Sequence, residues 1–246
     1  EDAPGVPIIT SENAEEVAAN GCARSTVKET YEFILGDLNK AIELLANTKK
    51  TRSDKRYVSL DVAYGIRARV HLTMHNYADA LKDAEAALAS TSSVPYSSAA
   101  VSKPTFIDIE DASWMWGILI TDKDRVSTTG ICNFPSHMGS LNYGYASVGG
   151  WRRISPKLYN QIPESDVRKG WFLDDTGVSV NLPAAAQAYI TKKGAPVYTQ
   201  VKYGPMNDEW GSNNNATDVI LMRVEEMYLI KAEAQAMNND VSGGVN

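Results

Sequence analysis

The stretch YEFILGDLNKAI at Tyr31–Ile42 decides the fold, because the chain repeats its pattern as YADALKDAEAAL at Tyr77–Leu88. A tyrosine, a large aliphatic residue, an aspartate and an alanine return at a constant offset of 46 positions, so that Asp37 corresponds to Asp83. A repeat of this kind is typical of stacked helix pairs, each of which buries its apolar face against its neighbours. The repeat therefore predicts a mainly α fold of the α-α superhelix type.

The first copy of the repeat lies in a helix with a clear start. Thr26 and Glu29 form a T-x-x-E capping box, in which each side chain accepts a hydrogen bond from the backbone N–H of the other residue. Prolines interrupt the preceding residues 1–24, which predicts an extended lead-in. Apolar residues then recur at the period of a helix: Val27, Tyr31, Ile34, Leu35, Leu38, Ala41, Ile42 and Leu45.

Two further helices are predicted, over residues 59–75 and from Tyr77 onward. The pattern Tyr64-x-x-x-Ala68, followed by Tyr77, resembles a tetratricopeptide unit. Residues 25–90 are therefore predicted to form tetratricopeptide-like helix pairs. Small residues on the inner face of the last helix let two helix axes approach closely: Ala80, Ala84 and Ala87.

The helical period disappears in residues 91–216, which we predict to be a loop-rich ligand region. A loop this long inside a compact domain is usually functional. Short strands are predicted in WMWGILIT, which begins at Trp114, around Tyr189, and over residues 198–203. A proline directly after Ser155 predicts the start of a short helix.

A strong helix is predicted again near the end of the sequence. Its pattern Tyr228-x-x-x-Ala232 repeats Tyr64-x-x-x-Ala68, so residues 217–246 are expected to begin a further helix pair. The sequence stops at about the place where the second helix of that pair is expected. We therefore expect one domain over residues 1–246 that is a fragment of a longer protein.

The composition excludes several classes of function. The 246 residues carry a net charge of -6, and no face rich in Lys and Arg emerges that could replace the counterions of nucleic-acid phosphates. No apolar run is long enough to cross a bilayer. Cys22 and Cys132 lie in no Cys/His cluster, so neither a metal nor another cofactor is expected. Whether these two cysteines pair with each other stays open.

Four segments, in chain order, resemble the SusD/RagB family. Gly5-Val6-Pro7 is similar to the GxP lead-in of the family, and residues 24–41 are similar to its R-[AS]-T-V-x-E-x-Y-x-x-I-x-x-D-L-x-x-A helix. Ser155-Pro156-Lys157-Leu158 with Asp166-x-Arg168 resembles a later segment. Residues 223–234, RVEEMYLIKAEA, resemble the last repeat of the family.

The resemblance implies a surface lipoprotein of Bacteroidetes in which tetratricopeptide-like helix pairs support a loop-rich face. It implies non-catalytic binding of an oligosaccharide or polysaccharide at the outer surface of the outer membrane. The glycan would be delivered to a SusC-like, TonB-dependent transporter. Contact with the membrane would be made through a lipid anchor that is not part of this sequence. A helical-repeat scaffold that binds a protein partner is the alternative.

The loop LNYGYASVGGWRR, residues 141–153, carries most of the candidate ligand-binding residues. A sugar packs its C–H face on aromatic rings, and covering one ring is worth about 1 to 2 kcal/mol. Two or three such rings would give roughly millimolar to tens-of-micromolar binding once ordering costs are subtracted. The candidates are Asn142, Tyr143, Tyr145, Trp151 and Arg153, together with Trp210 in a second polar loop.

Several chemically attractive residues have a structural alternative. Trp151 could instead fix its loop onto the helices, and Trp114 and Trp116 are expected to pack a sheet against a helix. His71 and His75 are spaced like metal ligands on a helix, yet no third ligand accompanies them. Helix packing is therefore the favoured interpretation of both histidines.

Neighbouring acids raise a third class of function, glycoside hydrolysis. Asp122 lies close to Asp124, and Asp174 is adjacent to Asp175. Such acids in loops are usually solvated turn residues, and the reaction needs a defined separation between two carboxyl groups. We therefore predict no catalytic residue.

Overall fold

The computed structural model describes residues 2–48, 50–128, 133–214 and 216–245, so that a pairing of Cys22 with Cys132 lies outside the described residues. The chain divides into two compact units. Unit 1 contains Glu1–Arg52, Val58–Thr91 and Glu226–Asn246, and unit 2 contains Ser53–Tyr57 and Ser92–Glu225. The single domain expected over residues 1–246 stays a prediction.

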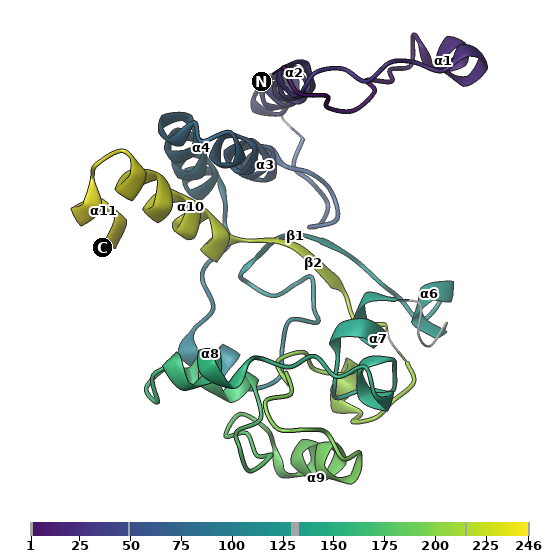
Figure 1. The fold of residues 1–246 in the computed structure, drawn as a ribbon, viewed down its shortest axis with the longest axis vertical. Helices are drawn as coiled ribbons and strands as arrows, with labels where there is room; N and C mark the ends of the chain where they lie inside the picture. Colours follow the sequence, from purple (N-terminus) through teal and green to yellow (C-terminus); the bar gives the residue numbers. More distant parts are fainter. Residues whose placement is uncertain (1, 49, 129–132, 215, 246) are drawn as a thin grey trace. The chain divides into compact units, whose positions relative to one another are not determined.

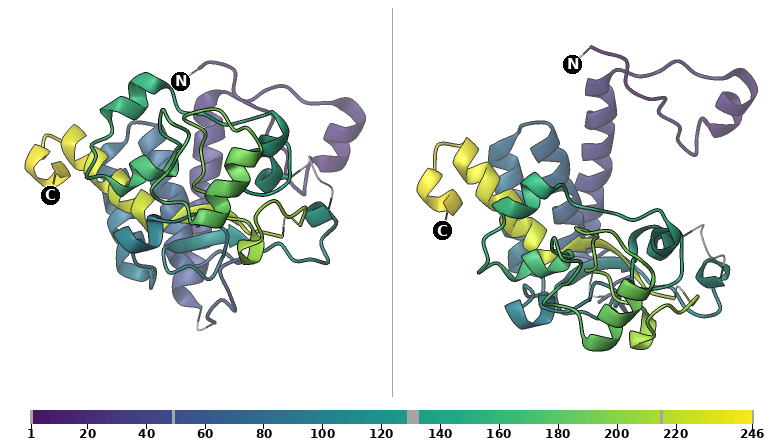
Figure 2. Two further views of the ribbon diagram at one scale, coloured as in Figure 1. Left: turned by 90° about the horizontal axis from the view of Figure 1, so that it is seen from below. Right: turned by 60° about the horizontal axis from the view of Figure 1, so that its bottom comes forward.

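Helices provide most of the regular structure in the described ranges, which confirms the predicted mainly α fold (Figure 1). In unit 1, α3 and α4 lie side by side in every view, and α2 contacts α3 (Figure 2). Within the described part of the chain, no helix has both the length and the apolar character that crossing a membrane requires. The helices of unit 1 are α1 (Ala14–Asn20), α2 (Val27–Asn47), α3 (Leu60–Thr73), α4 (Tyr77–Ser90), α10 (Val224–Met237, of which unit 1 holds the part from Glu226) and α11 (Val241–Val245).

The start of α2 confirms the predicted capping box. The backbone N–H of Thr26 donates to Glu29 Oε2 at 2.8 Å, and that of Glu29 donates to Thr26 Oγ1 at 3.1 Å. Arg24, which lies just before α2, stabilises the position of the N-terminal segment, because its Nε donates to the carbonyl of Gly5 at 2.6 Å. The prediction of an extended lead-in was wrong for α1, whose short helix lies within it.

The helix pair α3–α4 is packed through small residues, as the sequence predicted. Ala63 and Ala68 of α3 are buried, and Ala80, Ala84 and Ala87 of α4 are fully buried. Side chains this small allow the two helix axes to approach closely. The alanines of the repeat therefore determine the spacing of the pair.

Replacing Ala80 with leucine is expected to lower the free energy of unfolding by about 1 to 3 kcal/mol, because the extra methyl groups have no space between α3 and α4. Chemical denaturation measures the effect. Ala89 is an exposed alanine of the same helix, so Ala89→Leu is the matched control and should change the stability little. Equal stability of the two variants would contradict the packing argument.

A polar contact joins the first three helices of the repeat. Arg67 of α3 donates from Nε and Nη2 to the two carboxylate oxygens of Asp83 in α4, each at 2.6 Å. Its Nη1 donates to Asn39 of α2 at 2.5 Å. Asp83 is only 2% exposed, and its hydrogen bonds and charge raise the pKa of Arg67. The pair is therefore a buried, fully engaged ion pair.

The two histidines that resembled metal ligands have separate packing roles. His71 Nε2 lies 3.8 Å from Asp83, whereas the ring of His75 stacks on Tyr77 with the centroids 5.7 Å apart. No group of three His, Cys, Asp or Glu residues that could hold a metal exists among the described residues.

Helix α10 is tied to the other helices of unit 1 by charge. Arg69 of α3 donates from Nε and Nη2 to the two carboxylate oxygens of Glu226, each at 2.5 Å. Lys231 lies 3.0 Å from Glu85 of α4. Tyr228, which repeats Tyr64 in the sequence, is 50% exposed. The recurrence of the Tyr64 pattern in α10 is thus helical, but its tyrosine lies at the surface.

Unit 2 is loop-rich, as predicted for residues 91–216, and its described residues contain one small sheet. The predicted strand at Trp114 is confirmed as β1 (Trp114–Ile118), which pairs antiparallel with β2 (Val219–Arg223) (Figure 1). The short helices of unit 2 are α5 (Ser98–Val101), α6 (Arg125–Thr128), α7 (Phe134–Met138), η1 (Ala146–Val148), α8 (Pro156–Gln161), η2 (Val167–Trp171), α9 (Ala184–Lys192) and η3 (Met206–Asp208).

Two strand predictions in unit 2 were wrong. The residues around Tyr189 form the helix α9, which follows Pro183 and opens with three alanines. Residues 198–203 form only isolated bridges, among them Arg153 with Thr199 and Phe172 with Gln200. The helix expected after Ser155 is confirmed as α8, where Ser155 Oγ accepts from the N–H of Leu158 at 3.3 Å.

An aromatic cluster beside the sheet holds two cations. The Nζ of Lys202 lies 4.9 Å from the ring centroid of Tyr203 and 5.4 Å from that of Trp171. Arg223 of β2 lies 5.1 Å from the ring of Phe106, which Lys202 also faces. Burial lowers the pKa of Lys202, and the nearby charge of Arg223 lowers it further. Trp114 is fully buried and donates from Nε1 to the hydroxyl of Tyr96 at 2.9 Å, whereas its packing between a sheet and a helix stays a prediction.

Candidate functional site

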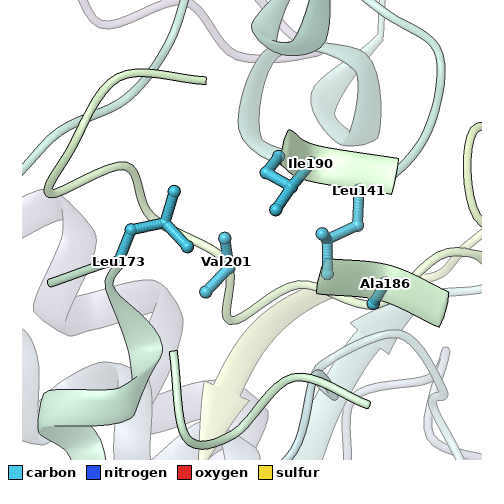
Figure 3. Packing of buried hydrophobic residues seen from close by; sticks show 5 residues of the cluster. All are labelled: Leu141, Leu173, Ala186, Ile190 and Val201. Carbon is cyan, nitrogen blue, oxygen red and sulfur yellow. The ribbon is translucent and has the colours of Figure 1, made fainter. Parts of the chain in front are cut away.

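A small hydrophobic cluster supports the loop that the sequence singled out. Trp151 and Trp210, two of the predicted ligand-binding residues, are partly buried and both pack against it. Ala186 and Ile190 come from α9, and the other members come from irregular segments (Figure 3). The two tryptophans therefore pack against the same hydrophobic cluster. The cluster consists of Leu141, Leu173, Ala186, Ile190 and Val201.

Tyr143 stands at the surface beside this cluster and is 46% exposed. Its backbone N–H donates to the carbonyl of Ser212 at 2.7 Å, and the N–H of Gly211 donates to the carbonyl of Leu141 at 2.8 Å. These bonds tie the loop of Tyr143 to the loop of Trp210. A ligand on Tyr143 would therefore meet a backbone that is held in place.

Lys193 links Tyr143 to a second tyrosine that the sequence did not indicate as a site residue. Its Nζ lies 5.7 Å from the ring centroid of Tyr143 and 5.8 Å from that of Tyr189. Tyr189 belongs to α9, and Lys193 caps that helix. Burial raises the pKa of Tyr189, although a hydrogen bond with Ser147 opposes the shift. Two aromatic rings and one cation are therefore gathered from segments far apart in the chain.

Tyr145 is the second exposed aromatic residue of the loop, at 45% exposure. Its ring stacks on His137, with the centroids 5.1 Å apart and an interplanar angle of 29°. Its backbone N–H donates to Ser136 Oγ at 2.9 Å. A Cβ at Gly150 would lie 2.6 Å from the Tyr145 ring, so Gly150 makes room for it. Tyr145 is thus held in one orientation while half of it remains open.

The two polar candidates of the loop differ from each other. Asn142 is only 1% exposed, and its backbone carbonyl accepts a hydrogen bond from the Tyr189 hydroxyl at 3.4 Å. The expectation that Asn142 offers its amide to a ligand therefore needs a correction, since the side chain lies inside the loop. Arg153 is exposed, and its Nε donates to the carbonyl of Val197 at 2.9 Å. We call Tyr143, Tyr145, Trp151, Arg153, Tyr189, Lys193 and Trp210 the aromatic surface.

The neighbouring acids occupy turns, as the sequence favoured. Asp124 accepts from the N–H of Thr121 at 2.7 Å and from its hydroxyl at 2.8 Å, and these bonds lower the pKa of Asp124. Asp174 Oδ1 accepts from the N–H groups of Thr176 at 2.8 Å and of Val178 at 3.0 Å. Both carboxylates therefore stabilise local backbone.

Fold and surface together define a class: a helical-repeat protein whose loop-rich unit presents exposed tyrosines beside packed tryptophans. Residues 3–72 match the model of a SusD-like family that is described as starch-binding and associating with the outer membrane. No curated protein matches the chain in sequence.

Solved structures resemble the whole chain. A SusD-like carbohydrate binding protein from Bacteroides vulgatus is 26% identical with a TM-score of 0.69, and the match covers 98% of this chain and 46% of that one. A SusD superfamily protein from Bacteroides thetaiotaomicron is 22% identical with a TM-score of 0.68, covering 98% and 50%. Surface glycan-binding protein A from the same species is 17% identical with a TM-score of 0.56, covering 90% and 55%, and shares the fold alone.

The chain spans about half the length of these solved structures. The family model covers the first two of the four sequence segments that resembled the family, and the structural matches extend over nearly the whole chain. The chain thus resembles the SusD/RagB family in sequence over residues 3–72 and in fold over nearly its whole length.

Proposed function

We propose that this protein binds an oligosaccharide or polysaccharide, without catalysis, on the aromatic surface of unit 2. The observation that carries the proposal is the state of Tyr143 and Tyr145, which are each nearly half exposed although their backbones are fixed by hydrogen bonds. Exposed rings that need no reordering lose little conformational entropy when a sugar stacks on them. Trp151 and Trp210 are partly buried and pack against the hydrophobic cluster that supports this loop.

The family adds a cellular setting to this proposal. Its description as starch-binding and associating with the outer membrane supports a role at the cell surface. We infer that the full-length protein carries a lipid anchor and passes its glycan to a SusC-like, TonB-dependent transporter. Isolation of the lipidated protein from outer membranes tests the partnership, since the transporter should then be recovered with it.

Replacing Tyr143 with alanine is expected to weaken oligosaccharide binding by about 5- to 30-fold, which corresponds to the loss of about 1 to 2 kcal/mol from one aromatic face. Isothermal titration calorimetry of the intact protein with a panel of oligosaccharides measures the effect. Tyr228→Ala is the matched control, because Tyr228 is exposed to a similar extent but belongs to unit 1.

Two outcomes of this titration would count against the proposal. Failure of the wild-type protein to bind any oligosaccharide of the panel would contradict glycan binding itself. Unchanged affinity of Tyr143→Ala would contradict the aromatic surface as the site. Trp151→Ala is less decisive, because Trp151 also packs against the buried cluster and its loss would disturb the loop.

The alternative function, a scaffold for a protein partner, has one observation in its favour. Tyr228 and Leu229 are exposed neighbours on α10, at 50% and 70%. A partner that binds the helices would lose affinity when these two residues are replaced. Its binding would not respond to Tyr143→Ala, so the two functions are separable.

A further inference from the structure

Unit 2 also contains a pocket, which shares no residue with the aromatic surface. Its volume is about 380 Å³, which lies within the range of small-molecule sites. The walls come from Tyr159 of α8, from residues 164–170 and from the segment 172–181. We call it the Tyr159 pocket.

Hydrogen bonds between distant segments build the walls of the Tyr159 pocket. Ser179 Oγ donates to the carbonyl of Gly170 at 2.5 Å, and Asn181 Nδ2 donates to the carbonyl of Val167 at 2.9 Å. Ser179 and Asn181 are both buried. A Cβ at Gly170 would collide with the amide of Asn181, so the two walls are in close contact there. The pocket is therefore formed by the fold without a ligand.

The charges that line the pocket do not balance. Asp166 is paired with Arg168 at 2.6 Å, and Glu164 is paired with Lys169. Asp174 has no basic partner among the residues that the structure describes, and its Oδ1 accepts hydrogen bonds from Thr176 and Val178. Burial raises the pKa of Asp174, but hydrogen bonds from Val178 and Thr176 outweigh burial and the net shift is downward. At neutral pH the pocket thus holds one ionised carboxylate without a counter-charge.

Tyr159 contributes a hydrogen-bond donor to the pocket, whereas Asp174 contributes an acceptor. Its side chain is almost buried, and Lys169 Nζ lies 5.0 Å from its ring centroid. Its hydroxyl takes part in no hydrogen bond with any described residue, although the ring lines the pocket. Burial raises the pKa of Tyr159, so the hydroxyl stays protonated and can donate. This hydroxyl is therefore free to donate to water or to a ligand in the pocket.

We propose that the Tyr159 pocket binds one neutral or amino sugar unit, as a second saccharide site beside the aromatic surface. A sugar hydroxyl or ammonium group donates to Asp174, and another hydroxyl accepts from Tyr159. The unbalanced carboxylate disfavours anionic sugars, since two like charges would be brought together in a partly buried site. The volume is large enough to admit a sugar ring. This second site rests on the residues that line the pocket and not on the aromatic surface.

Ligand-observed NMR with the double variant Tyr143→Ala/Tyr145→Ala tests the pocket, because the two most exposed rings of the aromatic surface are then absent and the response to Tyr159→Phe assigns the remaining binding. The probes are D-glucose, D-glucosamine and D-glucuronate. Glucose or glucosamine should show saturation transfer, and glucuronate should bind more weakly than either. Adding Tyr159→Phe, which keeps the ring and removes the hydroxyl, should weaken the binding by about 2- to 10-fold.

Leu158→Ala is the control within the same helix, because Leu158 is exposed and does not line the pocket. It should leave the binding unchanged. Absence of saturation transfer from all three probes in the double variant would overturn the second site. Equal binding with and without the Tyr159 hydroxyl would overturn it as well. Either result would leave glycan binding by the wild-type aromatic surface intact, so the two proposals fail separately.

Discussion

Replacing Asp83 with alanine is expected to lower the free energy of unfolding by about 3 to 5 kcal/mol. Asp83 is 2% exposed and accepts two hydrogen bonds from Arg67, whose side chain is itself mostly buried. Removing the carboxylate leaves the guanidinium charge of Arg67 inside α3–α4 without its counter-charge. Urea denaturation followed by circular dichroism measures the loss.

The repeat supplies its own control for this experiment. Asp37 occupies the same position in the first copy but is exposed on α2, so Asp37→Ala should change the stability by about 0.5 kcal/mol or less. The double variant Arg67→Met/Asp83→Leu should recover much of the loss, because it removes both charges together. Equal stability of Asp37→Ala and Asp83→Ala would contradict the burial argument.

Replacing Ile190 with alanine is expected to lower the free energy of unfolding by about 2 to 5 kcal/mol. It should also weaken glycan binding, although the side chain of Ile190 is buried and does not contact the ligand. Ile190 is fully buried in α9, within the cluster against which Trp151 and Trp210 pack. The cavity left by the missing methyl groups would loosen both tryptophans. Denaturation monitored by tryptophan fluorescence measures the first effect, and calorimetric titration measures the second.

Ile9→Ala is the matched control for this variant, since it makes the same chemical change at a side chain that is more than half exposed. It should leave both quantities nearly unchanged. Loss of stability in Ile190→Ala with unaltered glycan affinity would show that the cluster does not support the site. That result would separate the packing role of the tryptophans from ligand binding.

The helices of the repeat could be predicted because their signals are local. The Thr26–Glu29 capping box starts α2, and the alanines of α4 face α3, as the pattern indicated. Capping and helical period involve residues at most a few positions apart, so a single sequence displays them in full. The same holds for α8, where Ser155 and the proline after it open the helix.

Helix α9 was wrongly predicted as a strand. The aromatic and β-branched residues Tyr189 and Ile190 favoured a strand, yet Pro183 and the three alanines after it are a good helix start. Because α9 was missed, the position of Tyr189 beside Tyr143 was missed with it. The expectation for Asn142 failed for a different reason, since nothing local distinguishes its buried side chain from the exposed ring of Tyr143.

The sequence by itself determined the helical repeat, the loop-rich character of unit 2, and the resemblance to the SusD/RagB family. Only the tertiary structure decided that Asp83 is buried and Asp37 exposed, although both occupy the same position in the repeat. It also decided that Lys193 joins Tyr143 to Tyr189, and that Tyr159 lines a pocket with Asp174. Burial and pairing depend on which distant segments meet. The helical period and the capping residues do not specify which distant segments come into contact, so only the tertiary structure shows these contacts.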